Sequence, residues 1–393
     1  MFPLPGRLIA AICLLALSPS AARCADAFAD AQAAILARIQ RPQFAHRDFL
    51  VTDFGALADA DCTEAIAKAI AACHSAGGGR IVVPAGVWLT GAIHLKSNVN
   101  LHLADDATLR FSPESAKYLP AVLTRFEGIE CINYSPLIYA FGQENVAITG
   151  KGTLDGSASW ETWWAWNDKS KGTPTMQVAA RKKLDQQGTD GVPVEERVYG
   201  EGHFLRPNFI QPYRCQNVLI EGVTIINSPM WEIHPVLCTN VTVRGVTVRS
   251  LGTNNDGCNP ESCRDVLIED CVFETGDDCI AIKSGRNTDG RRINVPSENI
   301  VVRGCTMKDG HGGVTLGNKM SGGIRNVFVE NCFMSSPNLD RAIRLKSNSR
   351  RGDYLENLFV RNIEVGEVKE SVLHIDLRYM NKEVLDFRNE NIS

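Results

Sequence analysis

The stretch Cys215–Ile225, CQNVLIEGVTI, alternates apolar and polar residues on either side of a two-residue bend. Five later segments repeat the pattern: CTNVTVRGVTV (238–248), CRDVLIEDCVF (263–273), SENIVVRGCTM (297–307), IRNVFVENCFM (324–334) and LENLFVRNIEV (355–365). An earlier copy begins at Gln143. Alternation with a period of two predicts two short strands in each copy, each with one buried face.

The copies begin 23 to 34 residues apart and have no helical segment between them, so they cannot form layers of strands and crossover helices. They can stack as coils of a parallel β-helix, in which each coil buries its Val and Ile side chains against the next. The sequence therefore predicts an all-β fold. The Asn residues at one position of the repeat are expected to form a ladder of turns: Asn217, Asn240, Asn299, Asn326 and Asn357.

One segment near the N-terminus departs from the strand pattern. Residues 63–76 place Ile66, Ala69, Ile70 and Cys73 at helical spacing. We expect a short capping helix here, covering the first coil, because an open strand edge would otherwise invite aggregation.

The repeat is lost over residues 157–203, which form a polar insertion. Long irregular insertions of this kind are usually functional or disordered. Four tryptophans in it are candidates for contact with a sugar, and the alternative is that they only hold the insertion against the coils: Trp160, Trp163, Trp164 and Trp166.

The N-terminal residues are typical of a secretory signal, with Arg7 followed by an apolar run over residues 8–17 and then small residues. We predict a signal peptide over residues 1–24 and a β-helix catalytic domain over residues 25–393, the last coils of which are expected to be uncapped or incomplete. The protein is then periplasmic or secreted, with no other membrane segment. The net charge of −4 gives no reason to expect nucleic acid as a partner.

Eight of the thirteen cysteines fall between Cys215 and Cys332. An oxidising compartment permits disulfides, and Cys258 with Cys263 is a candidate pair closing a short loop. Cys271, Cys305 and Cys332 occupy apolar strand positions, where we expect small buried side chains stacked on one another.

Ionisable residues fall at a similar phase in four successive coils, after the second strand of the repeat. Similar phase in stacked coils means that residues are neighbours, about 4.8 Å apart per layer. Each residue alone has an ordinary structural explanation, such as a turn, but the shared phase favours a functional stripe. Its members are Asp256, then Asp277 and Asp278, then His311, and then Arg344 and Lys346.

Three carboxylates near a histidine and two cations suit the hydrolysis of a glycosidic bond. One carboxyl must stay protonated to donate to the leaving oxygen while another deprotonates water, and crowding separates their pKa values. Arg344 and Lys346 suit an anionic sugar, because Arg can hold a carboxylate with two hydrogen bonds. Asp277 and Asp278 can both face a cleft only if the backbone bends there, which Gly276 permits.

This stripe resembles glycoside hydrolase family 28, the polygalacturonase family, over roughly residues 53–346. The resemblance implies a right-handed, single-stranded parallel β-helix of the pectate-lyase-like kind. It also implies an inverting hydrolase of the α-1,4 bonds of galacturonan that needs no metal or other cofactor. The four ordered blocks of the family stand here as Asn254-Asn255-Asp256, Gly276-Asp277-Asp278, Gly310-His311-Gly312 and Arg344-Leu345-Lys346.

The resemblance also implies roles for individual residues. These are Asp277 as general acid, Asp256 and Asp278 as the pair that activates water, His311 as the residue that tunes the acid, and Arg344 and Lys346 as ligands of the galacturonate carboxylate. Asn254 and Lys283 are further candidates for substrate contact. Asn255 stands where many family members have Thr, a change that leaves the neighbouring carboxylate in place.

The insertion over residues 157–203 is similar to the extra loops of exo-acting bacterial members, which close one end of the cleft. We therefore expect exo action on pectic polygalacturonate by a monomer. The alternatives are a lyase on the same fold, a hydrolase of rhamnogalacturonan or xylogalacturonan, and a non-catalytic glycan-binding β-helix. A lyase would use calcium, which prefers six to eight oxygen ligands, and His311 within the stripe argues against such a site.

Overall fold

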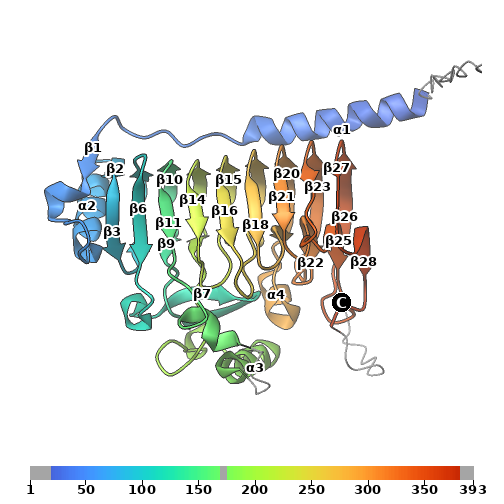
Figure 1. Cartoon of the computed structure of the whole chain (residues 1–393). Helices are drawn as coiled ribbons and strands as arrows, with labels where there is room; N and C mark the ends of the chain where they lie inside the picture. Colours follow the sequence, from blue (N-terminus) through green and yellow to red (C-terminus); the bar gives the residue numbers. More distant parts are fainter. Residues whose placement is uncertain (1–18, 169–174, 381–393) are drawn as a thin grey trace, which may run out of the picture.

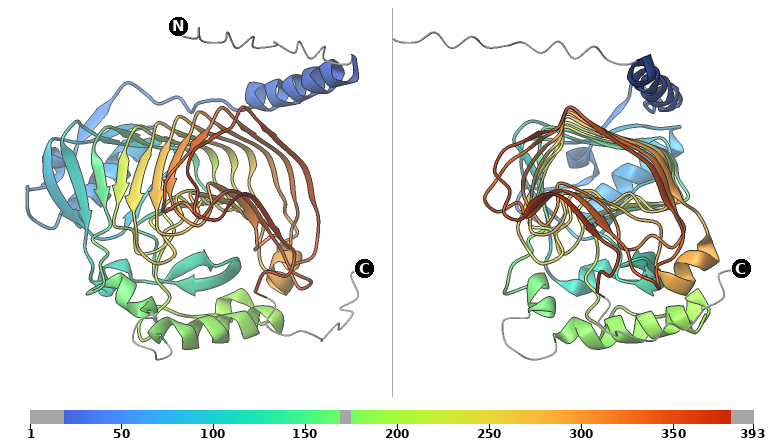
Figure 2. Two further views of the ribbon diagram at one scale, coloured as in Figure 1. Left: turned by 45° about the vertical axis from the view of Figure 1, so that its right-hand side comes forward. Right: turned by 90° about the vertical axis from the view of Figure 1, so that its right-hand side faces the viewer.

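The computed structural model describes residues 19–168 and 175–380, which form a stack of parallel strands (Figure 1). Viewed along the stack, successive coils superimpose (Figure 2). The expected parallel β-helix is therefore confirmed, and the coils contribute strands to three sheets, the third of which is interrupted.

The three sheets are named A, B and C here, and all of their strand pairs are parallel. Sheet A holds the first strand of each repeat: β1 (Asp48–Leu50), β2 (Gly79–Val83), β5 (Val99–Leu103), β10 (Glu144–Gly150), β13 (Gln216–Glu221), β15 (Thr239–Arg244), β17 (Arg264–Glu269), β20 (Ser297–Arg303), β23 (Ile324–Glu330) and β26 (Leu355–Arg361). Sheet B holds the second: β3 (Gly86–Thr90), β6 (Ala107–Phe111), β11 (Thr153–Asp155), β14 (Thr224–Ile226), β16 (Thr247–Ser250), β18 (Val272–Thr275), β21 (Thr306–Asp309), β24 (Phe333–Met334) and β27 (Glu364–Val365). Sheet C has two parts: β4 (Ile93–His94), β9 (Ile138–Phe141) and β12 (Ile210–Tyr213), then β19 (Ile280–Ile282), β22 (Val314–Gly317), β25 (Arg341–Lys346) and β28 (Ser371–Asp376).

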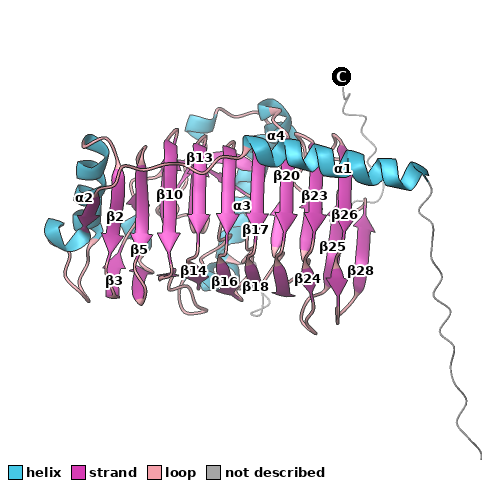
Figure 3. Ribbon diagram, turned by 90° about the horizontal axis from the view of Figure 1, so that it is seen from above, coloured by secondary structure: helices cyan, strands magenta, loops and turns pink. Residues whose placement is uncertain are grey.

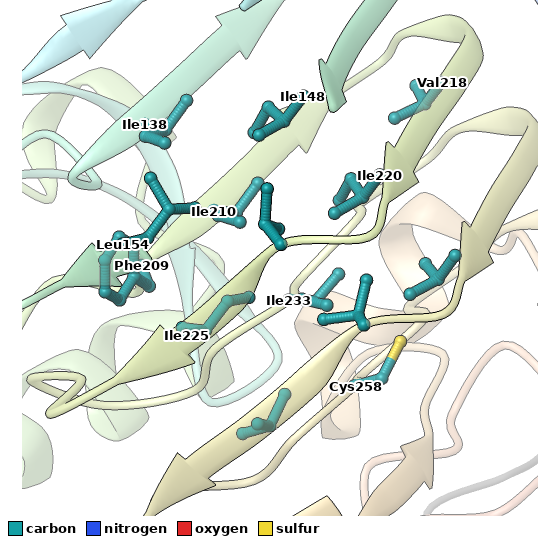
Figure 4. Close-up of a cluster of buried hydrophobic side chains, with 14 of the residues drawn as sticks. Ile138, Ile148, Leu154, Phe209, Ile210, Val218, Ile220, Ile225, Ile233 and Cys258 are labelled. Atoms are coloured by element: carbon teal, nitrogen blue, oxygen red, sulfur yellow. The ribbon is translucent and has the colours of Figure 1, made fainter. Parts of the chain in front are cut away.

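Equivalent apolar positions of successive repeats stack on one another. Val218 pairs with Val241, and Val241 with Val266, and all three side chains are buried. Figure 4 shows Val218, Ile220 and Ile233 among the side chains of this interior. Because every coil presents the same apolar positions, one continuous core runs through the stack.

The expected ladder of Asn residues is confirmed. Each of these residues has a positive φ, between 54° and 59°, which Asn tolerates better than most residues. Each amide nitrogen donates to a side-chain oxygen one coil earlier, over 2.7 to 3.1 Å: Asn217 to Asn145, Asn240 to Asn217, Asn299 to Asp265, Asn326 to Asn299 and Asn357 to Asn326.

Helix α1 (Pro19–Arg38) lies across sheet A, over its later strands (Figure 3). Ile35 packs against Leu267, Val301 and Phe328, which belong to β17, β20 and β23. No helix among residues 19–168 and 175–380 is long and apolar enough to cross a membrane. The predicted signal peptide overlaps the start of α1, but residues 1–18 lie outside the described part of the chain, so this expectation stays a prediction.

The chain at the end of α1 bridges a break in the Asn ladder. Asp265 replaces Asn in this repeat, and no side-chain bond joins it to Asn240 among the contacts of the described residues. The backbone of Gln40 instead bonds both polar atoms of the Asn240 amide, at 3.0 and 2.8 Å. Arg38 donates to Asp265 Oδ1 over 2.7 Å.

Helix α2 (Thr63–Ser75) packs at the first coil and confirms the predicted capping helix. Helix α3 (Met176–Thr189) was not expected within the insertion. Its buried side consists of Gln177, Ala180, Leu184 and Gly188. These positions have helical spacing, but two of them are not apolar, so the hydrophobic pattern does not reveal the helix.

The remaining elements are short. The hairpin of β7 (Val122–Phe126) and β8 (Ile129–Asn133) is antiparallel and lies outside the stack. Single-turn or short helices complete the description: η1 (Val51–Phe54), η2 (Ser115–Tyr118), η3 (Trp163–Asn167), η4 (Val194–Glu196) and α4 (Asn287–Ile293). The last coil leaves Leu373 and Ile375 of β28 each 57% exposed. Residues 381–393 lie outside the described range, so the expected incompleteness of the last coils stays a prediction.

The predicted disulfide between Cys258 and Cys263 is wrong. Every cysteine whose side chain the structure describes is a free, buried thiol. Both residues belong to the central core, because their positions repeat apolar positions of neighbouring coils. The expectation of small buried side chains is confirmed for Cys271, Cys305 and Cys332.

We predict that Asn299→Ala lowers the free energy of unfolding by about 2–3 kcal/mol. The substitution removes two hydrogen bonds, each contributing about 1 kcal/mol, and places a Cβ at a left-handed backbone position. Asn299→Gly is the matched control, since it loses the same bonds but accepts the positive φ, and should cost about 1 kcal/mol less. Urea denaturation of both variants is the measurement. Equal losses would show that the backbone conformation contributes nothing.

Candidate active site

The interrupted part of sheet C brings the three carboxylates of the stripe together. Cys258 pairs with Ile280, which sets Asp256 beside Asp278 one coil later. Oxygen atoms of these two carboxylates and of Asp277 lie within 4.8 Å of one another. The predicted grouping of the three acids in space is therefore confirmed.

Arg344 and Lys346 lie farther along their strand than a shared phase implies. Arg344 pairs with Thr315, which pairs with Ala281, three residues beyond Asp278. The long side chains nevertheless reach back to the carboxylates. Lys346 Nζ lies 2.6 Å from Asp278 Oδ2, and Arg344 Nη1 lies 3.4 Å from Asp278 Oδ1. The prediction that Arg344 and Lys346 lie beside the acids is right. The prediction that they share the position of the acids within the coil is not.

The backbone bends between β18 and β19, as the adjacent Asp pair requires. A Cβ at Gly276 would lie 2.1 Å from the carbonyl oxygen of Gly252, so glycine is needed for a close approach between coils. The Asp278 backbone N–H donates to Asp277 Oδ1 over 2.9 Å and holds the bend. As a result, the Asp277 side chain is 19% exposed while that of Asp278 is 2% exposed.

Asp277 is the member of the triad that reaches the surface. His311 Nδ1 lies 3.1 Å from its Oδ1, and Asn254 Nδ2 lies 3.5 Å from its Oδ2. Burial raises the pKa of Asp277, but the hydrogen bond and charge of His311, together with the charge of Lys346, outweigh burial and hold the pKa below its ordinary value. Asp277 in turn raises the pKa of His311.

Asp278 is enclosed and paired on both oxygens. Thr315 Oγ1 donates to Oδ1 over 2.8 Å, and Lys346 binds Oδ2. Burial raises the pKa of Asp278, but the charge of Lys346 outweighs it, so the net shift is downward. Asp278 is therefore ionised in the unliganded site.

At Asp256, unlike at Asp277 and Asp278, the effect of burial on the pKa outweighs that of the neighbouring positive charge. Lys283 Nζ and Asn259 Nδ2 each lie 3.1 Å from its Oδ2. Burial raises the pKa of Asp256 to about 7, with a further contribution from Asp277 and against the opposing charge of Lys283. Burial and the charge of Asp256 raise the pKa of Glu232, in the preceding coil. Since coupled acids titrate as a set, the triad shares one proton below about pH 7 and loses it above that pH.

The structure corrects the prediction that Lys283 contacts substrate. Its side chain is 2% exposed, and its ammonium group lies over the Trp231 ring at 4.7 Å while binding Asp256. The strand pattern predicts only that Lys283 leaves the core. It does not reveal that other segments cover this position.

Arg206 joins the insertion to the loop that carries Asn254, and nothing in the repeat marks it in advance. It is fully buried and donates to Asn254 Oδ1 over 2.8 Å and to the Thr253 carbonyl over 2.7 Å. It also donates to Gln177 of α3, over 2.9 Å. Burial lowers the pKa of Arg206 to about 9. The insertion therefore supports the surroundings of Asp277.

Tyr379 is a further residue that the sequence does not single out, because the last coil drifts from the repeat. The Arg344 guanidinium and the Lys346 ammonium each lie 5.2 Å from the centre of its ring. Cations over an aromatic face are attracted to it. Tyr379 therefore helps to orient the two cations of the site.

The four tryptophans of the insertion mainly hold it in place. Trp163 is 1% exposed and packs edge-on against Tyr118, so the prediction that it contacts a sugar is wrong. Trp164 Nε1 donates to the carbonyl of Ser228, and both Trp164 and Trp166 pack against the central core. Trp160 is 51% exposed, and its contact with a sugar stays a prediction.

Sheet C is covered in the coils that lead up to the triad. The hairpin β7–β8 lies over it, and buried Arg125 of this hairpin lies 3.2 Å from Glu261 Oε1. The other oxygen of Glu261 lies 2.7 Å from His234 Nε2. All three side chains are 0% exposed, although His234 and Glu261 point away from the core. The face of the sheet is thus closed on the N-terminal side of the triad.

Comparisons with known proteins agree with this geometry. Residues 201–392 match the model of glycosyl hydrolases family 28. The crystal structure of a hyperthermoactive exopolygalacturonase from Thermotoga maritima is 52% identical, with a TM-score of 0.86 over 91% of this chain and 81% of that one. The chain belongs to glycosyl hydrolase family 28. The predicted resemblance is therefore confirmed.

Two family members known by sequence are more distant. A probable polygalacturonase of Vitis vinifera is 31% identical over 83% of this chain and 62% of its own length. An exo-poly-alpha-D-galacturonosidase of Dickeya chrysanthemi is 28% identical over 86% of this chain and 58% of its own length. The chain thus spans less than two thirds of the length of these two relatives.

We predict that Asp277→Asn lowers the pKa of His311. The substitution removes the negative charge that stabilises the protonated imidazole, so the proton is lost at lower pH. An NMR titration of histidine-labelled protein measures the shift, and His311→Gln identifies the resonance. Asp340→Asn is the control, because Asp340 acts on His311 more weakly. An unchanged His311 titration in Asp277→Asn would contradict the pairing.

Proposed function

We propose that this protein is a polygalacturonase that hydrolyses α-1,4-linked galacturonan from the chain end. The main observation in support of this proposal is that one carboxyl, Asp277, lies at the surface, with two buried carboxylates behind it and with Arg344 and Lys346 nearby. Two of the family relatives described above are named as exo-acting enzymes, which supports hydrolysis from the chain end.

In the proposed mechanism Asp277 protonates the glycosidic oxygen as the bond from that oxygen to the anomeric carbon breaks. A water held by Asp256 and Asp278 attacks the anomeric carbon, and its proton passes to these carboxylates. Arg344 and Lys346 bind the carboxylate of the galacturonate beside the bond. The product then leaves with the proton that Asp277 supplied, and the triad again holds one proton.

Asp277 must be protonated for this step, although it is ionised in the unliganded site. Substrate binding changes the balance in two ways. The anionic sugar neutralises Lys346 and Arg344, which removes positive charge from the neighbourhood of Asp277. It also excludes water from the Asp277 carboxyl, and both effects raise a carboxyl pKa. The proton shared by the triad then moves toward Asp277, which leaves Asp256 free to act as base.

The spacing of the carboxylates is shorter than the 6.5–9.5 Å common between the acid and base of inverting enzymes. A retaining mechanism needs a second carboxylate able to attack the sugar directly. Asp256 and Asp278 are 5% and 2% exposed, and each is bound to a lysine. They are placed to hold water behind Asp277 rather than to form a bond with the sugar, which supports inversion.

A calcium-dependent lyase is the nearest rival, since three clustered carboxylates could hold a metal ion. The oxygens facing one another already bind Lys283 and Lys346, whose ammonium groups would repel a divalent cation. Calcium also needs six to eight oxygen ligands. The carboxylate oxygens of the triad are therefore better suited to binding the two lysines than to binding a metal ion.

The covered face of sheet C supports exo action. A substrate chain that extended along the coils before Asp256 would have to displace the hairpin β7–β8, which buried Arg125 anchors to Glu261. Removing one partner from such a buried pair costs several kcal/mol, about 3–5. The sugar chain therefore enters from one side only. Rhamnogalacturonan and xylogalacturonan remain alternative substrates in this arrangement.

We further infer that the protein acts as a monomer outside the cytoplasm, in the periplasm or after secretion. The support is the signal-like composition of residues 1–24. A polymeric substrate of plant cell walls also lies outside the cell.

The products of an early digest of polygalacturonate test the proposal. We expect steady release of mono- or digalacturonate with inverted configuration at the new reducing end, read by NMR, and little loss of viscosity. The Asp277→Asn variant should lower kcat about 10²–10⁴-fold, because it lacks the proton donor. A ladder of mixed oligomers would refute exo action. Unchanged hydrolysis by Asp277→Asn would support a non-catalytic role for that residue.

We also predict that kcat/KM falls above about pH 7, where Asp256 releases the proton that the triad needs. Lys283→Met should move this limb to higher pH, because loss of the neighbouring cation raises the pKa of Asp256. Initial rates across pH 5–9 at low substrate concentration measure both effects. If the limb does not move in Lys283→Met, a group other than Asp256 causes the fall in kcat/KM.

A further inference from the structure

The two oxygens of the Asp277 carboxyl have different surroundings. Oδ1 accepts the backbone N–H of Asp278 at 2.9 Å and lies 3.1 Å from His311 Nδ1. Oδ2 lies 3.5 Å from Asn254 Nδ2, a long contact for a hydrogen bond. An oxygen that already accepts two N–H donors is the harder one to protonate. An acidic proton on Asp277 therefore resides on Oδ2, beside the Asn254 amide.

The Asn254 amide is held in one orientation. Its Oδ1 accepts Arg206 Nη2 at 2.8 Å and Asn167 Nδ2 at 3.0 Å. A guanidinium has N–H donors and no acceptor, so the amide atom that faces it must be the oxygen. The NH₂ group is thereby left to face Asp277. An amide NH₂ group can donate to the acid but cannot accept its proton.

The opposite orientation would place the amide oxygen beside Asp277 Oδ2. An amide oxygen is an acceptor, so it would hold the acidic proton in a hydrogen bond within the protein. That proton would then be less available to the glycosidic oxygen. The observed orientation of Asn254 is therefore the one that leaves the proton for the substrate.

Arg206 is itself fixed by several partners. Its side chain is fully buried, and its Nη1 donates to the carbonyl oxygens of Thr253 and Pro229, both at 2.7 Å. Its Nε donates to Gln177 Oε1 of α3 at 2.9 Å. These acceptors are uncharged, so the planar fork of the guanidinium is held by the directions of its hydrogen bonds. A group held in this way is suited to fixing the orientation of a neighbour.

We propose that Arg206 is a positioning residue for proton donation, because it fixes the Asn254 amide so that Asp277 Oδ2 faces a donor and gives its proton to the leaving oxygen. The inference rests on the proposed function and deepens it. It assigns the proton to one oxygen of the acid. It also gives the insertion over residues 157–203 a part in the chemical step, through Asn167 and Gln177.

Steady-state kinetics on polygalacturonate test this role. Arg206→Met keeps most of the volume of the side chain but removes its donors. We expect kcat to fall about tenfold or more, the equivalent of one charge-assisted hydrogen bond, while KM changes less than about threefold. Gln177→Leu removes only the far partner of Arg206 and should lower kcat less.

The matched control is Gln186→Leu, which changes the same kind of side chain at an exposed position of α3. It should leave kcat and KM unchanged. A rise in KM at constant kcat in Arg206→Met, or an equal loss of activity in Gln186→Leu, would overturn the proposal.

Asn254→Asp tests the same arrangement with Arg206 in place, and it decides the matter if Arg206→Met does not fold. The introduced carboxylate still accepts from Arg206, but it presents an oxygen to Asp277 instead of an NH₂ group. We expect kcat to fall on the order of tenfold or more, because the acidic proton is shared between two carboxyls. The fall in kcat/KM above about pH 7 should move to higher pH, because the added negative charge raises the pKa values of the triad.

The groups that act on Asp277 are the same in this variant as in wild type: His311, Lys346, Lys283, Asp256 and Asp278. A shift of the limb therefore reports the exchanged amide. A lower kcat with an unmoved limb would show only a structural disturbance and would overturn the proposal.

An NMR measurement without substrate separates this proposal from the proposed function. In protein labelled with ¹⁵N-asparagine, the side-chain signal of Asn254 is identified by its loss in Asn254→Asp. Asp277→Ala should shift this signal, because the NH₂ group faces the carboxyl. In the background of Arg206→Met, or of Gln177→Leu if the former does not fold, the shift should be smaller.

A shift that depends on Arg206 or Gln177 in this way supports the positioning role, even if the protein proves unable to hydrolyse polygalacturonate. An Asn254 signal that does not respond to Asp277→Ala, or that responds equally in every background, refutes the positioning role, even if hydrolysis is found.

Discussion

Backbone pairing between successive coils is the interaction on which the rest of the structure depends. Through it, residues some twenty to thirty positions apart in the chain become neighbours across one strand spacing. The triad exists because Cys258 pairs with Ile280. A slip of one residue would turn every side chain of the strand to the other face, and the buried stripe that includes Val241 and Val266 opposes any such slip.

This dependence explains how much of the molecule could be read from the sequence. The alternation of apolar residues and the position of the Asn residues encode the register, so the coils, the capping helix and the grouping of the acids were predictable. The segments that cover the outer face of the coils were not predictable. Lys283 occupies an outward position of its strand, but only the tertiary structure shows that Trp231 and other groups bury it.

The same limit applies to orientation and to irregular segments. Spacing alone suggested a bond between Cys258 and Cys263, whereas the coil geometry places both thiols in the core. Helix α3 buries Gln177 and Gly188 in addition to apolar residues, so no hydrophobic periodicity announces it. Arg206 and Tyr379 lie in segments that do not repeat, and their importance follows only from what they contact.

Charges in the candidate active site are nearly all matched within the protein. Asp278 is held by Lys346, Asp256 by Lys283 and Asp277 by His311. If an anionic substrate binds Lys346, as proposed above, its carboxylate competes with Asp278 for the same ammonium group. Under that proposal, binding is coupled to the distribution of protons among the acids, whose positions are already held by their protein partners.

Helix α1 has a consequence for the order in which the molecule can be assembled. It precedes all coils in the chain, yet its anchors belong to β17, β20 and β23, and Gln32 bonds Glu330 across 298 residues of sequence. A chain synthesised or translocated from its N-terminus therefore presents this helix long before its docking surface exists. The helix can close over sheet A only after the later coils have wound, so its docking marks the completion of most of the stack.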